Sequence, residues 1–389
     1  MNIVFLKLYI TDEVNSAFYN SQEMGLAKAL VKAHPEHRVD IVLVSRSVTA
    51  REKVQVPDHD TARDPGNGGG EKSRITLHIV PGRGIGHHGI IDLSILEELN
   101  ADLVHLLADN MFFAPRVINY CLKNNIRCHL YIGTIISDSS NGLKQLVNRT
   151  MIGRNLAAYK KVPVYVKTPH VQKQLQGFGI DAKLAPVGLD REALKTSGKD
   201  FYDIRQHYGL AFEKKILLYV GRLEDYKRPF DALELIKSLS DTEDGTGYLL
   251  LMIGDGILGD ELDSRIRELG LQEKVRRIKK VPNAEMKDLF KACDYFVNFN
   301  RVEIYGMAIL EAMAGGCPVF AMRAPGPDFL VEDGKTGFLC DSVEDMSDKI
   351  SAFEKDEILR NAITGNARSH IENDLIWDKT VECFEDWNN

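Results

Sequence analysis

Short apolar runs alternate with longer stretches of helical period along most of the chain. In the first half the apolar runs lie at residues 3–8, 39–44, 75–80, 103–107, 128–133 and 162–167. After residue 190 the pattern restarts, with runs at 216–221, 248–254, 275–281, 295–299 and 317–322. Such runs are typical of strands buried on both faces of a parallel sheet, with helices between them. The restart therefore predicts two doubly wound α/β domains.

The stretch at 188–212 contains no sustained apolar run. Domain boundaries fall in such segments, so we expect one Rossmann-like domain over residues 1–190 and a second over 191–371. A polar stretch rich in Pro and Gly at 49–74 predicts a mobile surface loop. This loop is either a plain insertion or a segment that shapes an acceptor site.

Length and composition agree with two globular domains. The chain has 389 residues, of which 44% are hydrophobic and 27% charged, which is enough to bury two cores. Its net charge of −7 argues against a nucleic-acid partner. Six cysteines without a C-x-x-C pair indicate reduced thiols. The apolar start is too short for a signal segment or a membrane span, so we expect a cytoplasmic protein.

The motif YVGRLEDYK places two cations directly after an apolar run. Gly221 ends the predicted strand, Arg222 follows it, and Lys227 lies five residues further on. Ligands of doubly wound domains bind outside the carboxyl ends of the strands, so both cations are placed to hold an anion such as a diphosphate. The alternative is a solvated loop in which they pair with Glu224 and Asp225.

The motif EIYGMAILEAMAGG predicts a short helix at about 306–314, directly after another apolar run. Gly306 allows a close approach of the backbone, and the amides of Gly306 and Met307 would form an anion site at the helix N-terminus. Glu303 lies just before this site. Glu311, inside an otherwise apolar helix, is either half-buried against a hydroxyl-bearing partner or simply exposed.

Together these motifs resemble glycosyltransferase family 4, the retaining sugar-nucleotide enzymes of GT-B fold. The resemblance covers most of the second domain through LLYVGRLEDYKRPFDAL, LMIGDGILGDEL and ACDYFVNFNRVEIYGMAILEAMAGGCPVFAMRAPGPDFLVEDGKTGFL, in the family's order. APVGLD at 185–190 resembles the family's hinge, and LIWDKTVECFEDW resembles its closing helix. The resemblance implies two Rossmann-like domains facing each other across a cleft, with the closing helix at about 372–389 packed back on the first domain.

The resemblance also implies which residues carry the chemistry. Arg222 and Lys227 would hold the donor diphosphate. Glu303 would lie against the donor sugar near its anomeric carbon. These three are the expected catalytic residues.

Further donor contacts are implied in the second domain. The backbone amides of Gly306 and Met307 would complete the phosphate clamp. Glu311 would bind the ribose hydroxyls of the nucleotide, and the segment from Ile278 to Val281 would meet its base.

The first domain resembles the family less. TDEVNSAFYN stands where many members have a pair of glycines, and YIGTIIS stands where many have a histidine close to the donor sugar. His105, within LVHLL, is more simply explained as a core or strand-end histidine. GRGIGHHG at 82–89 is either a turn between a strand and a helix or a glycine-rich loop over a ligand.

We therefore expect a retaining, metal-independent hexosyltransferase that moves a sugar from a nucleotide diphosphate donor to the hydroxyl of a glycan or lipid-linked acceptor, in polysaccharide, glycolipid or glycan biosynthesis. The donor is a co-substrate, and no cofactor or metal is expected. DHD at 58–60 matches a D-x-D pattern but follows no apolar run. The alternatives are a non-hydrolysing sugar-nucleotide epimerase of the same architecture and a non-catalytic sugar-nucleotide-binding protein.

Residues 139–180 carry basic but no acidic side chains, although the chain is acidic overall. The basic residues are Lys144, Arg149, Arg154, Lys160, Lys161, Lys167 and Lys173. Their bias favours a peripheral contact with anionic lipid at the inner face of the membrane. They spread around a helix expected at 143–161 and form no single stripe, so an ordinary solvated helix is the alternative.

Overall fold

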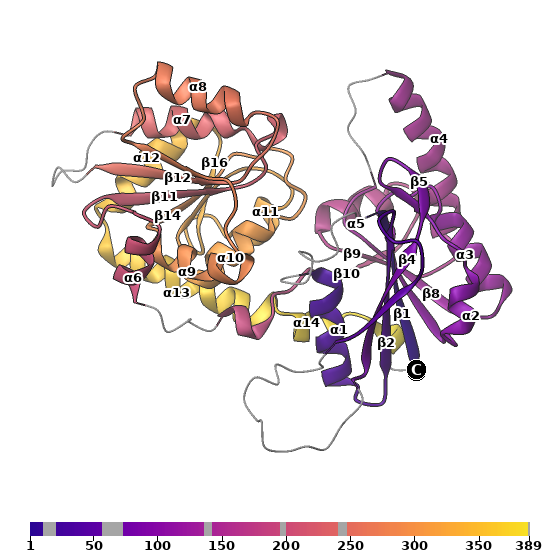
Figure 1. Cartoon of the computed structure of the whole chain (residues 1–389). Helices are drawn as coiled ribbons and strands as arrows, with labels where there is room; N and C mark the ends of the chain where they lie inside the picture. The colour runs from indigo at the N-terminus through magenta and orange to yellow at the C-terminus, as the bar shows by residue number, and fades with distance from the viewer. Residues whose placement is uncertain (11–20, 57–72, 136–141, 195–199, 240–246, 388–389) are drawn as a thin grey trace. The chain divides into compact units, whose positions relative to one another are not determined.

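The chain divides into two compact units (Figure 1). Unit 1 comprises Met1–Gly188 and Trp377–Asn389, and unit 2 comprises Leu189–Ile376. The computed structural model describes residues 1–10, 21–56, 73–135, 142–194, 200–239 and 247–387. Each unit has its own sheet and therefore its own core.

Unit 1 is built on a mainly parallel sheet. Its parallel strands are β1 (Asn2–Ile10), β2 (Arg38–Ser45), β4 (Ile75–Pro81), β7 (Leu103–Leu107), β8 (Arg127–Ile132), β9 (Val164–Val166) and β10 (Ala182–Leu184). They lie in the order β10-β9-β8-β7-β1-β2-β4, with β3 (Glu52–Val56) antiparallel at the edge. The chain thus starts at the centre, builds outward to β4, and returns to build the other half. This is a doubly wound sheet.

Helices cover the sheet of unit 1. They are α1 (Gln22–Ala33), α2 (Ser94–Glu98), α3 (Ala114–Lys123), α4 (Gly142–Tyr159), α5 (Pro169–Gln176) and the closing α14 (Trp377–Glu382). The helix expected at 143–161 is confirmed as α4. Helix α14 packs on α1 so closely that a Cβ on Gly25 would lie 2.1 Å from Nε1 of Trp377. Only glycine fits at this crossing.

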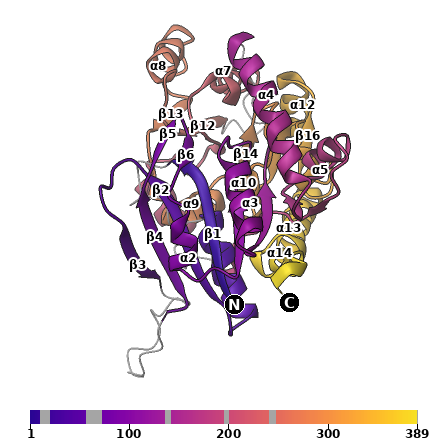
Figure 2. The ribbon, with the colours of Figure 1, turned by 90° about the vertical axis from the view of Figure 1, so that its right-hand side faces the viewer.

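The first strand and the closing segment of unit 1 lie close together (Figure 2). Trp387, in the short 3-10 turn Glu385–Trp387, is 1% exposed, and its ring lies 6.3 Å from that of Phe5. His105 is fully buried beside it, as expected of a core histidine, and burial holds its pKa well below the usual value. Its Nδ1 lies 2.7 Å from Nε2 of His129, whose own Nδ1 lies 3.0 Å from a carboxylate oxygen of Asp386. The closing segment therefore completes the core of unit 1.

Unit 2 carries the second doubly wound sheet. Its strands are β11 (Lys215–Val220), β12 (Tyr248–Ile253), β13 (Val275–Ile278), β14 (Tyr295–Asn298), β15 (Val319–Met322) and β16 (Phe338–Cys340). All the pairs are parallel, in the order β13-β12-β11-β14-β15-β16. Each of the eleven apolar runs found in the sequence overlaps one of the parallel strands of the two units, whereas β10 and β16 correspond to no such run.

Helices lie on both faces of the unit 2 sheet (Figure 1). They are α6 (Phe201–His207), α7 (Pro229–Ser238), α8 (Gly259–Glu268), α9 (Asn283–Ala292), α10 (Met307–Gly315), α11 (Pro327–Leu330), α12 (Val343–Glu354) and α13 (Glu357–Asp374), with 3-10 turns at Arg191–Leu194 and Asp225–Lys227. The core between α7, α8, α12 and the sheet is aliphatic and aromatic, and includes Leu233, Leu262, Met346 and Phe353. Burial of these side chains fixes the strands whose ends form the candidate site.

Two sequence expectations for unit 1 need correction. Part of the stretch 49–74 is strand β3, because the alternating EKVQV can pair along β4 while its side chains stay largely solvated. The segment at 82–89 forms most of a hairpin of β5 (Arg83–Ile85) and β6 (His88–Ile90), which turns at Gly86 with φ of 57°. Among the described helices, none is long and apolar enough to cross a membrane.

Candidate active site

The candidate site lies where the winding of the unit 2 sheet changes direction. Strands β12 and β13 extend the sheet on one side of β11. The chain then returns, and β14 pairs with β11 on its other side. Doubly wound sheets commonly bind ligands at such a switch point, outside the carboxyl ends of the strands. The loop after β11 carries Arg222 and Lys227, and the loop after β14 carries Glu303.

An ion pair joins these two loops. Nζ of Lys227 lies 2.6 Å from Oε2 of Glu303, and the two side chains are 21% and 16% exposed. The same oxygen accepts a 2.9 Å hydrogen bond from the side-chain amide of Asn300, a residue that is 2% exposed. Because two donors converge on one oxygen, the carboxylate is held in a fixed orientation. Asn300 was missed in the sequence.

Arg222 lies at the rim of the same loop. Its side chain is 68% exposed and donates to Glu224 (3.1 Å) and to the hydroxyl of Tyr226 (2.5 Å). The ring of Tyr226 lies near both cations, 5.6 Å from the guanidinium of Arg222 and 5.3 Å from Nζ of Lys227. The alternative was a solvated loop in which both cations pair with Glu224 and Asp225. The Arg222–Glu224 contact is present, whereas Lys227 pairs with Glu303.

Glycines set the path of the cationic loop. At Gly254, where φ is 144°, a Cβ would lie 1.9 Å from the carbonyl oxygen of Gly221. The next residue of this IGDG segment, Asp255, accepts a 3.0 Å backbone bond from Leu223. Burial raises the pKa of the Tyr219 hydroxyl, which donates to the carbonyl of Lys227 at 3.3 Å. The backbone on both sides of Arg222 is therefore fixed by unit 2 itself.

Helix α10 begins beside Glu303, as the sequence predicts. Its N-cap, Gly306, has φ of 101° and ψ of 61°, and Ile309 and Leu310 both donate to the carbonyl of Gly306. A Cβ there would lie 3.0 Å from Cδ1 of Ile309 and 3.4 Å from Cγ of Glu303. The amides at the start of the helix precede its first internal hydrogen bonds, so they are placed to meet an anion.

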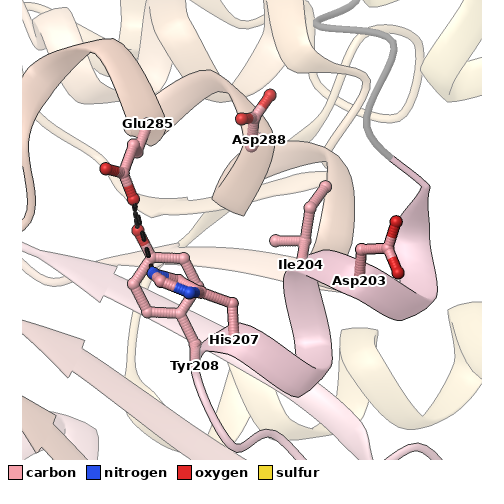
Figure 3. Close-up of a pocket in the computed structure, with 6 residues that line it drawn as sticks. All are labelled: Asp203, Ile204, His207, Tyr208, Glu285 and Asp288. Atoms are coloured by element: carbon pink, nitrogen blue, oxygen red, sulfur yellow. Dashed lines mark hydrogen bonds and ion pairs between the residues drawn. The ribbon is translucent and has the colours of Figure 1, made fainter.

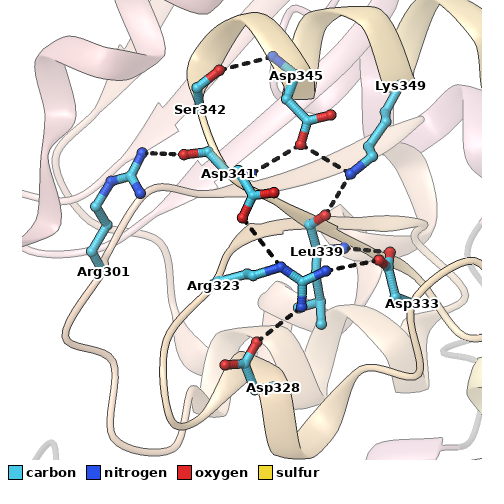
Figure 4. A network of polar contacts seen from close by, with 9 residues as sticks. All are labelled: Arg301, Arg323, Asp328, Asp333, Leu339, Asp341, Ser342, Asp345 and Lys349. Carbon is cyan, nitrogen blue, oxygen red and sulfur yellow. Dashed lines mark hydrogen bonds and ion pairs between the residues drawn. The ribbon is translucent and has the colours of Figure 1, made fainter.

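A polar network anchors the loop that carries Glu303 (Figure 4). Arg301 donates to the carbonyl of Asp341 at 2.7 Å, and Gly326 donates to the carbonyl of Glu303 at 2.8 Å. Arg323 completes the network with carboxylates at 3.6 Å, 3.1 Å and 3.2 Å, from Asp328, Asp333 and Asp341 respectively. Since these contacts join β15, β16 and the loop, they limit how far Glu303 can move.

The remaining predicted donor contacts lie around this centre. Glu311 lies in the middle of α10 and is half-buried. Ile278 ends β13 and Val281 follows it, 5% exposed, on the far side of β12 from β11. The structure thus brings Arg222, Lys227 and Glu303 together at one end of the sheet, and places the other residues at neighbouring strand and helix ends.

A cavity between α6 and α9 lies apart from these residues (Figure 3). Its volume is about 270 Å³, and it is lined by Asp203, Ile204, His207, Tyr208, Glu285 and Asp288. Tyr208 donates to Glu285 across it. None of its lining residues was predicted for the site. Three first-domain segments of the sequence analysis, TDEVNSAFYN, DHD and the last part of YIGTIIS, lie outside the described residues.

Unit 2 thus carries a cation–carboxylate pair at the switch point of a doubly wound sheet, which is where such sheets commonly bind their ligands. A model of the family "Glycosyl transferases group 1" matches residues 200–370. This segment is nearly all of unit 2, and the match confirms the resemblance found in the motifs.

Relatives of known name agree with this assignment. The chain is 30% identical to a D-inositol 3-phosphate glycosyltransferase of Corynebacterium jeikeium over 55% of this chain and 54% of that protein. It is 25% identical to an N-acetyl-alpha-D-glucosaminyl L-malate synthase of Bacillus anthracis over 48% of each chain. The chain thus matches about half the length of these relatives.

The fold likeness extends over both units. The crystal structure of Anabaena HepE in complex with UDP matches 98% of each chain with a TM-score of 0.71, at 17% sequence identity. At this identity the match shows the fold alone. The GT-B fold class predicted from the sequence is confirmed.

Replacing Gly306 with Ala should destabilise unit 2 by about 1–3 kcal/mol, because φ of 101° is unfavourable for a residue with a Cβ. Gly365, inside α13, has nothing within 4 Å of the Cβ position, so Gly365→Ala should be neutral or stabilising by up to about 1 kcal/mol. Urea unfolding of the two variants measures the difference. Equal effects would show that the start of α10 relaxes without strain.

Proposed function

We propose that the protein transfers a sugar from a nucleotide diphosphate donor to an acceptor hydroxyl, with retention of the anomeric configuration. The observation that carries this proposal is the Lys227–Glu303 pair at the switch point of unit 2, beside the N-terminus of α10. This arrangement places an expected anion site, made by Lys227 and the start of α10, next to the carboxylate of Glu303. The names of the glycosyltransferase relatives support the same reaction class.

Donor binding would rearrange the ion pair. The diphosphate carries more negative charge than one carboxylate, so Lys227 would turn toward it with Arg222 and the first amides of α10. Glu303 would keep its bond from Asn300 and accept hydroxyl groups of the sugar near the anomeric carbon. Glu311 would bind the ribose, and the strand end from Ile278 to Val281 would meet the base. UDP, which is bound in the HepE structure, is the first nucleotide to test.

The transfer step needs charge stabilisation at the departing diphosphate. The bond between the anomeric carbon and the phosphate oxygen breaks, and its electron pair stays on the diphosphate. Arg222, Lys227 and the amides of α10 would stabilise the charge that develops there, which makes the step independent of a metal ion. The acceptor oxygen bonds to the anomeric carbon on the face that the diphosphate leaves, and its proton passes to the diphosphate. The product therefore keeps the donor's configuration.

The acceptor would be a glycan or a lipid-linked molecule, as in the synthesis of a polysaccharide or glycolipid. The cytoplasmic location inferred from the sequence stays a prediction. Within residues 150–180, Lys160 and Lys173 are exposed, as is Phe178, whose side chain is 46% exposed. Basic side chains around an exposed aromatic ring favour a contact of this region with anionic lipid headgroups.

Replacing Lys227 with Ala should weaken the binding of UDP and of the donor by about 1.5–3 kcal/mol, because a charge-assisted contact to phosphate is lost. Arg222→Ala should act in the same direction. Lys237→Ala, on the exposed side of α7, is the matched control and should leave binding unchanged. Calorimetric titration measures all three. If UDP does not bind the unchanged protein, the nucleoside diphosphate that does bind takes its place in the titration. Unchanged affinity for that nucleotide in both site variants would remove these cations from the donor site.

Replacing Glu303 with Gln should reduce turnover by about 100-fold or more and change nucleotide affinity much less, because its contact is to the sugar and to the charge that forms there. At a temperature well below the midpoint of unfolding, a chelator should leave turnover unchanged. NMR of the product should show the donor's anomeric configuration. Full turnover by Glu303→Gln, or an inverted product, would contradict the mechanism. Epimerised donor without transfer, or binding without turnover, would favour the epimerase or the non-catalytic binder.

If the region around Lys160 and Lys173 docks on lipid, the protein should sediment with vesicles that contain anionic lipid and should be released by salt, which screens charges over about 10 Å at 0.1 M. The variant Lys160→Glu with Lys173→Glu should lose this binding. The matched control is Lys335→Glu with Lys379→Glu, which places the same charge change elsewhere on the surface. Equal recovery on neutral vesicles would assign α4 to the solvated alternative.

A further inference from the structure

Three metal-ligating side chains meet in the turn between α1 and β2. The backbone amide of His37 donates to the carbonyl of His34 at 3.0 Å, which closes a four-residue turn and brings the two imidazoles together. Their rings are nearly parallel, with centroids 5.2 Å apart. Glu36 lies between them, with its Oε1 3.6 Å from Nδ1 of His34 and 3.4 Å from Nδ1 of His37.

The distances fit a small tetrahedral ion. With bonds of about 2.0–2.1 Å to nitrogen and oxygen, the ligand atoms of tetrahedral zinc are about 3.3 Å apart. The two distances from Oε1 of Glu36 to the histidine nitrogens are already close to that value. The ligand atoms of all three residues lie within 4.8 Å of one another. Glu36 is 63% exposed, so its carboxylate can adjust at little cost.

The contacts of the buried histidine favour the tautomer that a metal ligand needs. Nε2 of His37 lies 2.9 Å from the carbonyl oxygen of Trp387, which can only accept a hydrogen bond, so Nε2 carries the proton. The Met1 nitrogen, a donor, lies 3.2 Å from Nδ1, so Nδ1 presents its lone pair. A zinc-bound imidazole is typically held by just such a bond from its other nitrogen to a carbonyl. His37 is 5% exposed, so this orientation is fixed by packing.

We propose that His34, Glu36 and His37 form a zinc(II) site, with Nδ1 of each histidine and Oε1 of Glu36 as ligands and a fourth position open to water. Zinc would replace the Met1 contact on Nδ1 of His37. Two imidazoles and one carboxylate are a ligand set that zinc accepts. The site lies in unit 1 and uses none of the residues assigned to the donor.

The site would stabilise the closing segment of the chain. His37 connects the metal ligands to the carbonyl of Trp387, whose ring stacks on Phe384 at 4.2 Å. A metal that holds His37 in place therefore also holds the carbonyl of Trp387, which accepts the hydrogen bond from Nε2. Trp377 and Trp387 are the only two tryptophans in the chain, and both belong to this segment. Tryptophan emission consequently reports on the part of unit 1 that zinc should hold.

Titration of the untagged full chain with zinc should show one site per chain by calorimetry. An excess of zinc should raise the midpoint of thermal unfolding, followed by tryptophan emission, by about 5 °C. A chelator should reverse the shift. Cobalt(II), bound in place of zinc, should give the visible absorption of a four-coordinate ion.

The variants His34→Ala and Glu36→Gln test the site without disturbing the buried His37. Each should weaken zinc binding by about 10-fold or more and abolish the shift at the same zinc concentration. His370→Ala is the matched control, because His370 also lies beside a carboxylate, with Nδ1 3.0 Å from Asp374, but belongs to no three-ligand cluster among the described residues. Unchanged zinc affinity in both site variants, an equal loss in the control, or binding without an upward shift would overturn the proposal.

Discussion

The adjacency of β11 and β14 is the constraint on which the candidate site depends. Strand order in unit 2 is set by burial of apolar strands and by the helices that cross between them, and it brings together two loops separated by 76 residues. Only because these strands are neighbours can Lys227 reach Glu303. If one more strand lay between β11 and β14, the two side chains would be about 5 Å further apart, which is beyond the reach of a direct ion pair. The core therefore determines the chemistry at its edge.

The ion pair also orients two different groups at the candidate site. A partly buried carboxylate and ammonium each lose hydration, and the attraction between them offsets part of that loss. If a donor binds as proposed, its phosphate would meet the ammonium and its sugar hydroxyl groups the carboxylate, so one set of contacts would be exchanged for another. Asn300 would stay on the carboxylate during this exchange. Groups that are already oriented need less reorganisation during a reaction.

The sequence predicted the features that follow from periodicity and from motifs within one segment. Apolar runs located the described parallel strands except β10 and β16, and the motif around Gly306 located α10, because local burial and backbone freedom leave direct marks on residue type. Strand β3 was missed because an edge strand of alternating polar residues resembles a loop. Asn300 and Tyr226 were missed because their roles come from contacts that only the fold creates. A buried Asn directly after an apolar run was the available signal for the first.

The two units differ in how far family comparison can explain them. The match over 200–370 covers the unit that carries the proposed donor site, where binding of a diphosphate would require cations and helix amides. Unit 1 lies outside that range and is matched through its fold, at 17% identity over the whole chain, because a sheet can be conserved in shape while its loops change. The turn at His34–His37 belongs to this part. Its contact with Trp387 joins residues 350 positions apart, so it helps to hold the last segment of the chain on unit 1.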